Sequence, residues 1–108
     1  IKTGSGDDTV ELHRDWRFDG DLKIVTGSGD DVLLVGDGGD ITLNGKVNDN
    51  LGSGDDTVYV KYANVYGSPD AIAINGGSGN DSLFTDVNWD ISDWQDIGAK
   101  IKGFETVG

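Results

Sequence analysis

Four aspartates, each near the end of a short glycine-rich segment, are the residues of this sequence best suited to chemistry. The segments read TGSGDDTV at positions 3–10, TGSGDDVL at 26–33, LGSGDDTV at 51–58 and GGSGNDSL at 76–83. Their leading glycines, Gly4, Gly27, Gly52 and Gly77, lie 23, 25 and 25 residues apart. One such segment is an ordinary turn, but four at nearly constant spacing are an internal repeat. The repeat therefore places one carboxylate-bearing loop in every period.

A loop of this composition offers oxygen ligands for a hard cation. Calcium binds six to eight oxygens at about 2.3–2.6 Å and accepts both carboxylates and backbone carbonyls. Glycine permits φ > 0 and leaves its carbonyl unobstructed. Two stacked loops would then surround one ion between them, with an Asp carboxylate closing the shell. Four stacked loops predict about three Ca²⁺ sites, one between each pair of neighbours.

The same stacking makes the loops unfavourable without metal. Aspartates on neighbouring rungs, about 5 Å apart, repel one another. A divalent cation between them turns that repulsion into attraction. We therefore expect folding and calcium binding to be one coupled event.

Between the loops, apolar and polar residues alternate with a period of two, which predicts short strands with one buried face. The alternation is clear at 10–13, 22–24, 41–43, 58–62 and 72–74. Each period would hold a loop, a strand, a second turn and a strand that returns to the next loop. Equivalent residues of successive periods would form two internal columns: Val10, Leu33, Val58 and Leu83, and beside them Leu12, Val35 and Val60.

The predicted fold class is thus all-β, a parallel β-roll or β-solenoid with strands about 4.8 Å apart from coil to coil. It has about four coils, which start near residues 3, 26, 51 and 76 of a single domain, with the loops stacked along one edge. Residues 86–108 are predicted to be an irregular or capping segment. Ile91, Trp94 and Ile97 indicate a helical turn there, and 101–108 resembles 22–27, so that Gly108 would end the chain just before a fifth loop.

Composition narrows the possible partners. The net charge is −12, and of 20 acidic residues only Glu11 and Glu105 are not Asp, the acid that suits turns and cation sites close to the backbone. Acid-rich disorder does not fit the alternating apolar runs, and a halophilic surface does not fit acids at fixed positions. The negative charge makes nucleic acid and an anionic membrane surface poor partners for this chain. Because no apolar run is long enough to span a bilayer, we expect no membrane insertion, and we expect no signal peptide within these residues.

Cysteine and methionine are both absent, and position 1 is Ile. Disulfides and thiolate metal sites are therefore excluded. A chain without an initial Met is expected to be a segment of a longer protein, whose neighbouring repeats or domains would be its partners.

The four segments resemble the repeat-in-toxin (RTX) nonapeptide, G-G-x-G-x-D-x-U-x, a calcium-binding repeat. Residues 76–84 match every fixed position, and the other three segments lack only the first glycine. The resemblance implies a right-handed parallel β-roll with calcium between its loops. It also implies type I secretion and folding outside the cell, and hence a secreted or cell-surface location.

The resemblance also implies a ligand set. The family's liganding aspartate corresponds to Asp8, Asp31, Asp56 and Asp81, and the lesser candidates are Asp7, Asp30, Asp55 and Asn80. The carbonyl ligands correspond to the residues before them: Thr3, Gly4, Ser5, Gly6, Thr26, Gly27, Ser28, Gly29, Leu51, Gly52, Ser53, Gly54, Gly76, Gly77, Ser78 and Gly79.

The spacing departs from the family pattern. The family repeats its loop on both edges of an 18-residue coil, whereas the loop here comes once in about 24 residues. In this respect the chain resembles the calcium modules of very large bacterial adhesins. A second-edge motif at 36–43 has its apolar residue shifted by one position, so calcium at that edge stays open.

Three function classes are open to this sequence: a structural module, a ligand-binding ladder and an enzyme. The leading one is a structural calcium-binding module that is not an enzyme, since His13 is the only histidine and paired aspartates in a repeat are usually structural. The second is a ligand-binding ladder for ice or polysaccharide, formed by Ser5, Ser28, Ser53 and Ser78. Trp16, Trp89 and Trp94 could form a sugar-binding surface or be buried under the cap or at the second edge.

Overall fold

Period-two alternation builds the strands of this protein. The computed structural model describes residues 1–12, 17–35, 41–43, 45–60, 65–67, 72–85 and 100–107, and in these ranges it is all-β. The strands are β1 (Thr9–Leu12), β2 (Arg17–Phe18), β3 (Leu22–Val25), β4 (Val32–Val35), β5 (Ile41–Leu43), β6 (Val47–Asn50), β7 (Thr57–Val60), β8 (Val65–Gly67), β9 (Ile72–Asn75), β10 (Ser82–Thr85), β11 (Lys100–Lys102) and β12 (Thr106–Val107). Within these ranges no helix is long and apolar enough to cross a membrane.

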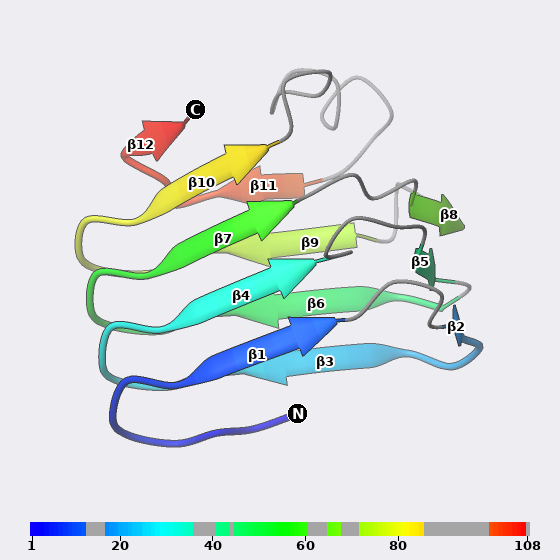
Figure 1. The fold of residues 1–108 in the computed structure, drawn as a ribbon, viewed down its shortest axis with the longest axis horizontal. Helices are drawn as coiled ribbons and strands as arrows, with labels where there is room; N and C mark the ends of the chain where they lie inside the picture. Colours follow the sequence, from blue (N-terminus) through cyan, green and yellow to red (C-terminus); the bar gives the residue numbers. More distant parts are fainter. Residues whose placement is uncertain are drawn as a thin grey trace.

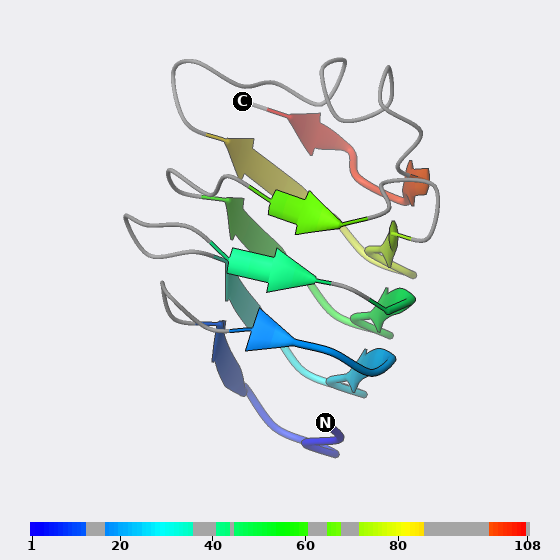
Figure 2. The same cartoon turned by 90° about the vertical axis from the view of Figure 1, so that its right-hand side faces the viewer.

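The strands form three sheets in which every pairing is parallel. Their orders are β1-β4-β7-β10-β12, β3-β6-β9-β11 and β2-β5-β8. The first two lie one behind the other (Figure 1), and the third lies at the edge opposite the glycine-rich loops (Figure 2). Partners in a sheet are always strands from successive repeats, so each repeat adds one rung to each of the two larger sheets.

The core lies between the two larger sheets. From the first sheet, both predicted columns are confirmed: Val10 pairs with Leu33, Leu33 with Val58 and Val58 with Leu83, and all four are buried. Leu12, Val35 and Val60 form the second buried column. The second sheet contributes Leu22, Ile24, Val47, Ile74 and Ile101. The pleat that alternates side chains across each strand therefore gives one continuous apolar layer.

The sequence predicted two strands in each period, whereas the first three periods contain three. The strand that leads into the third loop is β6, which the apolar pattern did not reveal. One of its two inward positions is Asp49, which pairs with Ile24 on one side and Ile74 on the other and is only 2% exposed. Burial raises the pKa of Asp49 from 3.8 to about 7, partly offset by the N-terminal ammonium.

The expectation that the chain stops before a fifth loop is wrong. Ile101 pairs with Ile74, and Thr106 pairs with Ser82, so β11 and β12 lie on either side of the loop position. Only residues 103–105 connect them, where residues 76–81 connect β9 to β10. Residues 100–107 of the segment predicted to be irregular therefore extend both sheets. The predicted helical turn at 91–97 lies outside the described residues.

Candidate metal centre

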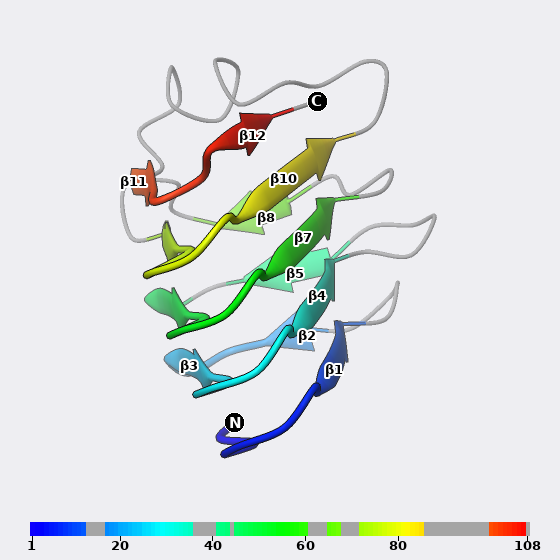
Figure 3. The ribbon, with the colours of Figure 1, turned by 90° about the vertical axis from the view of Figure 1, so that its left-hand side faces the viewer.

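The four glycine-rich loops lie in register at one edge of the molecule (Figure 3). Ser5 pairs with Ser28, Ser28 with Ser53, and Ser53 with Ser78, all in parallel. Between the first two loops, Gly6 N–H donates to Ser28 O (2.9 Å) and Ser28 N–H donates to Gly4 O (3.1 Å). The same two hydrogen bonds recur in the next two gaps between loops. The loops are thus rungs of the same ladder as the strands that follow them.

Glycine is required at the points where the loops touch. Gly27 and Gly29 have φ values of 94° and 120°, which L side chains rarely adopt. A Cβ on Gly27 would lie 1.9 Å from Gly4 O, and one on Gly29 would lie 2.3 Å from Gly6 O. The carbonyls of one loop therefore press directly on the glycines of the next. Without side chains at these points, the gap between two loops is lined by backbone oxygens.

The inner aspartates (Asp8, Asp31, Asp56 and Asp81) form a ladder of their own. Asp8 N–H donates to Asp31 Oδ1, Asp31 N–H to Asp56 Oδ1 and Asp56 N–H to Asp81 Oδ1, at 2.8, 2.8 and 2.9 Å. Asp31, Asp56 and Asp81 are fully buried. The carboxylates of Asp31, Asp56 and Asp81 therefore reach back into the gap between their own loop and the preceding one.

The second oxygen of each inner aspartate has no hydrogen-bond partner. Oδ2 of Asp8, Asp31, Asp56 and Asp81 is buried and unsatisfied in all four cases. In the fourth loop it faces the loop interior, since a Cβ on Gly76 would lie 2.8 Å from Asp81 Oδ2. An ionised oxygen that is buried without a donor costs about 1–3 kcal/mol or more. Because the same oxygen is unsatisfied in all four loops, it follows from the conformation that the loops share.

The outer residues of the loops (Asp7, Asp30, Asp55 and Asn80) are exposed and point in the opposite direction. Asp30 N–H donates to Asp7 Oδ1, Asp55 N–H to Asp30 Oδ1 and Asn80 N–H to Asp55 Oδ1, at 2.8 to 3.0 Å. Each gap between loops thus holds one buried carboxylate from the later loop and one exposed carboxylate from the earlier loop. The pairs are Asp31 with Asp7, Asp56 with Asp30, and Asp81 with Asp55.

The electrostatics reflect this crowding. The pKa of Asp56 is raised from 3.8 to about 6, chiefly by burial; the hydrogen bond from Asp31 N–H lowers it, and the charges of Asp31, Asp81 and Asp30 contribute to the rise. Burial also raises the pKa of Asp81, with Glu105 and Asp55 adding to the shift. The carboxylates of the gaps are therefore poorly compensated by the protein alone.

Glu105 extends the inner ladder, although it was not among the predicted ligand residues. Asp81 N–H donates to Glu105 Oε2 (3.1 Å), as the other inner N–H groups donate to the next Asp. The shortened connection at 103–105 lacks the Gly-Ser-Gly signature, so no motif marked it. The two carbon atoms between Cα and the carboxylate carbon of Glu suit a loop that is three residues shorter. A fourth gap, between Asp81 and Glu105, thus also holds a carboxylate of the inner ladder, although Glu105 itself is exposed.

The carbonyls of the first residues in the second and third loops accept hydrogen bonds from threonine hydroxyls. Thr26 O accepts from Thr3 Oγ1 (3.0 Å), and Leu51 O accepts from Thr26 Oγ1 (2.8 Å). The carbonyls of Gly4, Gly27 and Gly52, and of Ser28, Ser53 and Ser78, accept backbone N–H groups. A carbonyl oxygen has two lone pairs, so one hydrogen bond leaves capacity for a cation.

The donor set fits calcium in its chemistry. Among the described residues no group of three or more His, Cys, Asp or Glu side chains is positioned to hold a metal. A cation in a gap would be held by two carboxylates together with backbone oxygens, a mixture that calcium accepts. Oxygens on neighbouring rungs, about 4.8 Å apart, are separated by about twice the Ca–O distance. The two ionised carboxylates of each gap carry a charge of −2, which one divalent cation would neutralise.

Several predicted features lie outside the part of the chain that the structure describes. These are His13, the three tryptophans Trp16, Trp89 and Trp94, and residues 36–40 of the second-edge motif. The turn at residues 18–21 is described, and there Lys46 N–H donates to Asp21 Oδ1 (2.9 Å).

In comparisons with known proteins, no family model, no curated protein and no solved structure matches this chain.

Proposed function

We propose that this chain is a calcium-binding structural module that folds when Ca²⁺ binds between its stacked loops. The observation that carries the proposal is the repeated, buried and unpartnered Oδ2 of the inner aspartates. An orphaned anionic oxygen is costly unless a cation completes it, and three of the four, those of Asp31, Asp56 and Asp81, belong to carboxylates that reach into a gap between two loops. Sodium or potassium would leave one negative charge in each gap, whereas one Ca²⁺ neutralises both carboxylates.

The proposed ions lie in the three gaps between the four loops. Asp31 and Asp7 would hold the first, Asp56 and Asp30 the second, and Asp81 and Asp55 the third, with glycine and serine carbonyls as further ligands. Glu105 makes the gap after the fourth loop a weaker candidate, because Asn80 replaces the second carboxylate there.

The proposed architecture is a right-handed parallel β-roll with about four full coils, divergent from the RTX pattern in its coil of about 24 residues. Parallel pairing of strands one repeat apart and the in-register loops support it. Such a module would act as a rigid, non-catalytic segment of a longer secreted or cell-surface bacterial protein exported by type I secretion. Repeats of this kind need stacked neighbours to bury their faces, which suits a spacer.

Calcium titration tests the proposal. Protein freed of metal with a chelator should have a weak β signal in circular dichroism and a low unfolding temperature. Added Ca²⁺ should raise both, since binding to the folded state alone stabilises by about 2.7 kcal/mol for each site at 100 times its Kd. Mg²⁺ at the same concentration should have a much smaller effect, because it demands compact octahedral geometry. Unfolding that is independent of Ca²⁺ would contradict the proposal.

A further inference from the structure

The outward face of the sheet β3-β6-β9-β11 differs in charge from the rest of the protein. Its inward residues are apolar apart from Asp49, and the alternate residues face outward. The eight described outward residues share one property, which is that none is acidic: Lys23, Val25, Asn48, Asn50, Ala73, Asn75, Lys100 and Lys102. In a chain with net charge −12, three lysines and three amides on one flat face are a marked segregation of charge.

The strand register arranges these residues in two rows across the sheet. Lys23 pairs with Asn48, Asn48 with Ala73 and Ala73 with Lys100. In the second row Val25, Asn50, Asn75 and Lys102 follow one another in the same way. Lysines therefore lie on the two outer strands, β3 and β11, and amides on the two strands between them. Three strand spacings separate the two ends, about 14 Å.

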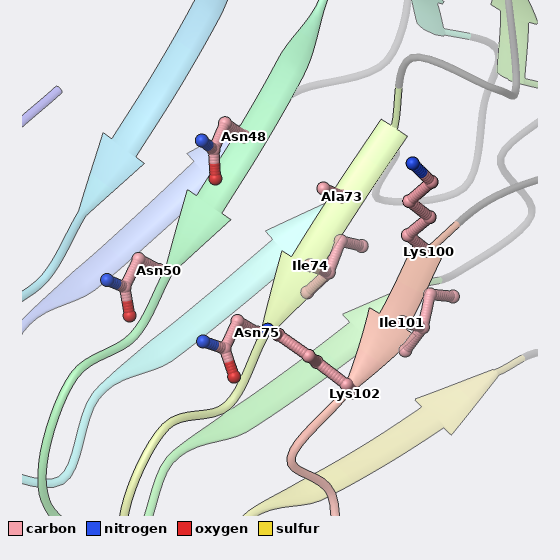
Figure 4. A pocket seen from close by; sticks show the side chains of 8 residues that line it. All are labelled: Asn48, Asn50, Ala73, Ile74, Asn75, Lys100, Ile101 and Lys102. Atoms are coloured by element: carbon pink, nitrogen blue, oxygen red, sulfur yellow. The ribbon is translucent and has the colours of Figure 1, made fainter.

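A hollow lies over β6, β9 and β11, towards the β11 end of these rows (Figure 4). It has a volume of about 400 Å³ and is lined by side chains of β6, β9 and β11, among them Asn48, Asn50, Asn75, Lys100 and Lys102. Ala73 leaves room there, since it stands between the longer Asn48 and Lys100 in its row. Asn75 Oδ1 accepts from Gly77 N–H (3.1 Å), which fixes the orientation of this amide.

A second hollow of about 410 Å³ lies at the other end of the sheet. Ile1, Lys2, Lys23 and Val25 line it, and Lys2 pairs with Val25 in parallel. The basic residues of the face thus border a hollow at each end, and the amides lie between them. This order of groups across the strands defines what a ligand must carry.

We propose that this face binds a linear carboxylated polysaccharide that crosses the strands. Lysine ammonium groups pair with carboxylates at the two ends, and the asparagine amides both donate to and accept from sugar hydroxyls in the middle. None of the eight outward residues is aromatic, so a neutral sugar has no ring to stack on and charge must supply the attraction. The net charge of −12 disfavours nucleic acid, whose dense phosphates extend beyond the lysine face.

The test uses an oligouronate hexasaccharide as the probe, with Ca²⁺ in excess over both protein and sugar. Binding is followed by calorimetry and by NMR shifts of the Asn48, Asn50 and Asn75 amides. The matched sugar control has its carboxyls reduced to alcohols. The protein variants are Lys23→Gln and Lys102→Gln, and Arg17→Gln is the control because it removes the same charge from β2, in another sheet. Circular dichroism checks that every variant keeps its fold.

We expect Lys23→Gln and Lys102→Gln each to weaken binding about fivefold, as an exposed ion pair does. The reduced sugar should bind at least about tenfold more weakly, and Arg17→Gln should bind like the wild type. The proposal is overturned if the oligouronate does not bind the folded protein, or if the reduced sugar binds equally well. It is also overturned if a DNA oligonucleotide or vesicles of anionic lipid bind through the same lysines more tightly than the oligouronate. These outcomes are independent of the calcium proposal, which the chelation experiment tests separately.

Discussion

Asp31, Asp56 and Asp81 each use their two carboxylate oxygens differently. Oδ1 accepts the N–H of the equivalent residue in the preceding loop and so fixes the register between loops. Oδ2 is buried without a partner and is the oxygen that a cation would complete. Replacement by Asn keeps this hydrogen bond, because Asn retains one acceptor oxygen. It removes the second, negatively charged oxygen. This difference separates the structural from the metal-binding contribution of the residue.

Asp56→Asn should therefore weaken calcium binding in the second gap by at least about tenfold, equal to about 1.4 kcal/mol. Asp30→Asn is the matched control from the same gap, because Asp30 is exposed and its Oδ1 accepts from Asp55 N–H, whereas Asp56 is buried. We expect Asp30→Asn to change affinity less than Asp56→Asn. Isothermal titration with Ca²⁺ measures both. Equal losses for the two variants would show that burial of Oδ2 does not select the ligand.

Asp49 is the one acidic side chain in the described apolar layer. It occupies the position of Ile24 and Ile74 in the neighbouring strands, and its Oδ1 has no partner. Asp49→Ile should therefore stabilise the protein by about 1–3 kcal/mol, because it removes a buried unsatisfied group and continues the apolar column. Urea unfolding at saturating Ca²⁺ measures the gain. A loss of stability would mean that the Asp49 carboxylate makes a necessary contact.

At the scale of the elements, the glycine-rich loop is defined by contact between repeats as well as by its own backbone angles. Gly52 has φ of 93°, and a Cβ there would lie 1.9 Å from Gly27 O. Gly4 has φ of 103°, but a Cβ there meets nothing within 4 Å. Both positions therefore require a positive φ, but only at Gly52 would a Cβ collide with the neighbouring loop.

Gly4→Ala should destabilise the protein by about 1–2 kcal/mol through its positive φ alone. Gly52→Ala should cost about 1–3 kcal/mol more, because the added methyl forces two loops apart. Thermal unfolding in Ca²⁺ measures both variants. Equal destabilisation would mean that the loops do not stack as closely as the Gly27–Gly52 contact requires.

Many of the loops and strands could be predicted from the sequence. The loops and the two apolar columns follow from a repeat of nearly constant length, because equivalent residues of parallel strands must align. β6 could not be predicted, since Asp49 breaks the alternation that marks a buried strand. β12 was missed because the connection before it is three residues shorter than the repeat and has Glu105 in place of Asp. The pairing of the outer and inner carboxylates across each gap depends on side-chain direction, which spacing does not fix.

At the scale of the whole molecule, the acidic charge makes stability depend on pH and on metal together. The pKa of Asp49 is raised from 3.8 to about 7 and that of Asp56 from 3.8 to about 6, both first by burial, and that of Asp81 is also raised. A carboxyl whose pKa is higher in the folded state binds more protons there than in the unfolded state. Stability then falls as pH rises between the unfolded and folded pKa values.

Metal-free protein should therefore be most stable near about pH 4 and lose stability up to about pH 7, where Asp49 and Asp56 have ionised. Saturating Ca²⁺ favours the ionised form of Asp56 and Asp81 and should reverse their contribution, so that stability rises with pH. Unfolding temperatures at a series of pH values, with chelator and with Ca²⁺, measure both curves. Parallel curves would indicate that no titrating loop carboxylate binds calcium.

The most direct test of the central claim is a crystal structure of the protein grown in excess Ca²⁺, with anomalous diffraction data. We expect one anomalous peak in each of the three gaps between the four loops. Each peak should contact Oδ2 of the buried aspartate of its gap, Asp31, Asp56 or Asp81. Well-ordered loops with no anomalous peak between them, or peaks only at the exposed outer carboxylates, would contradict it.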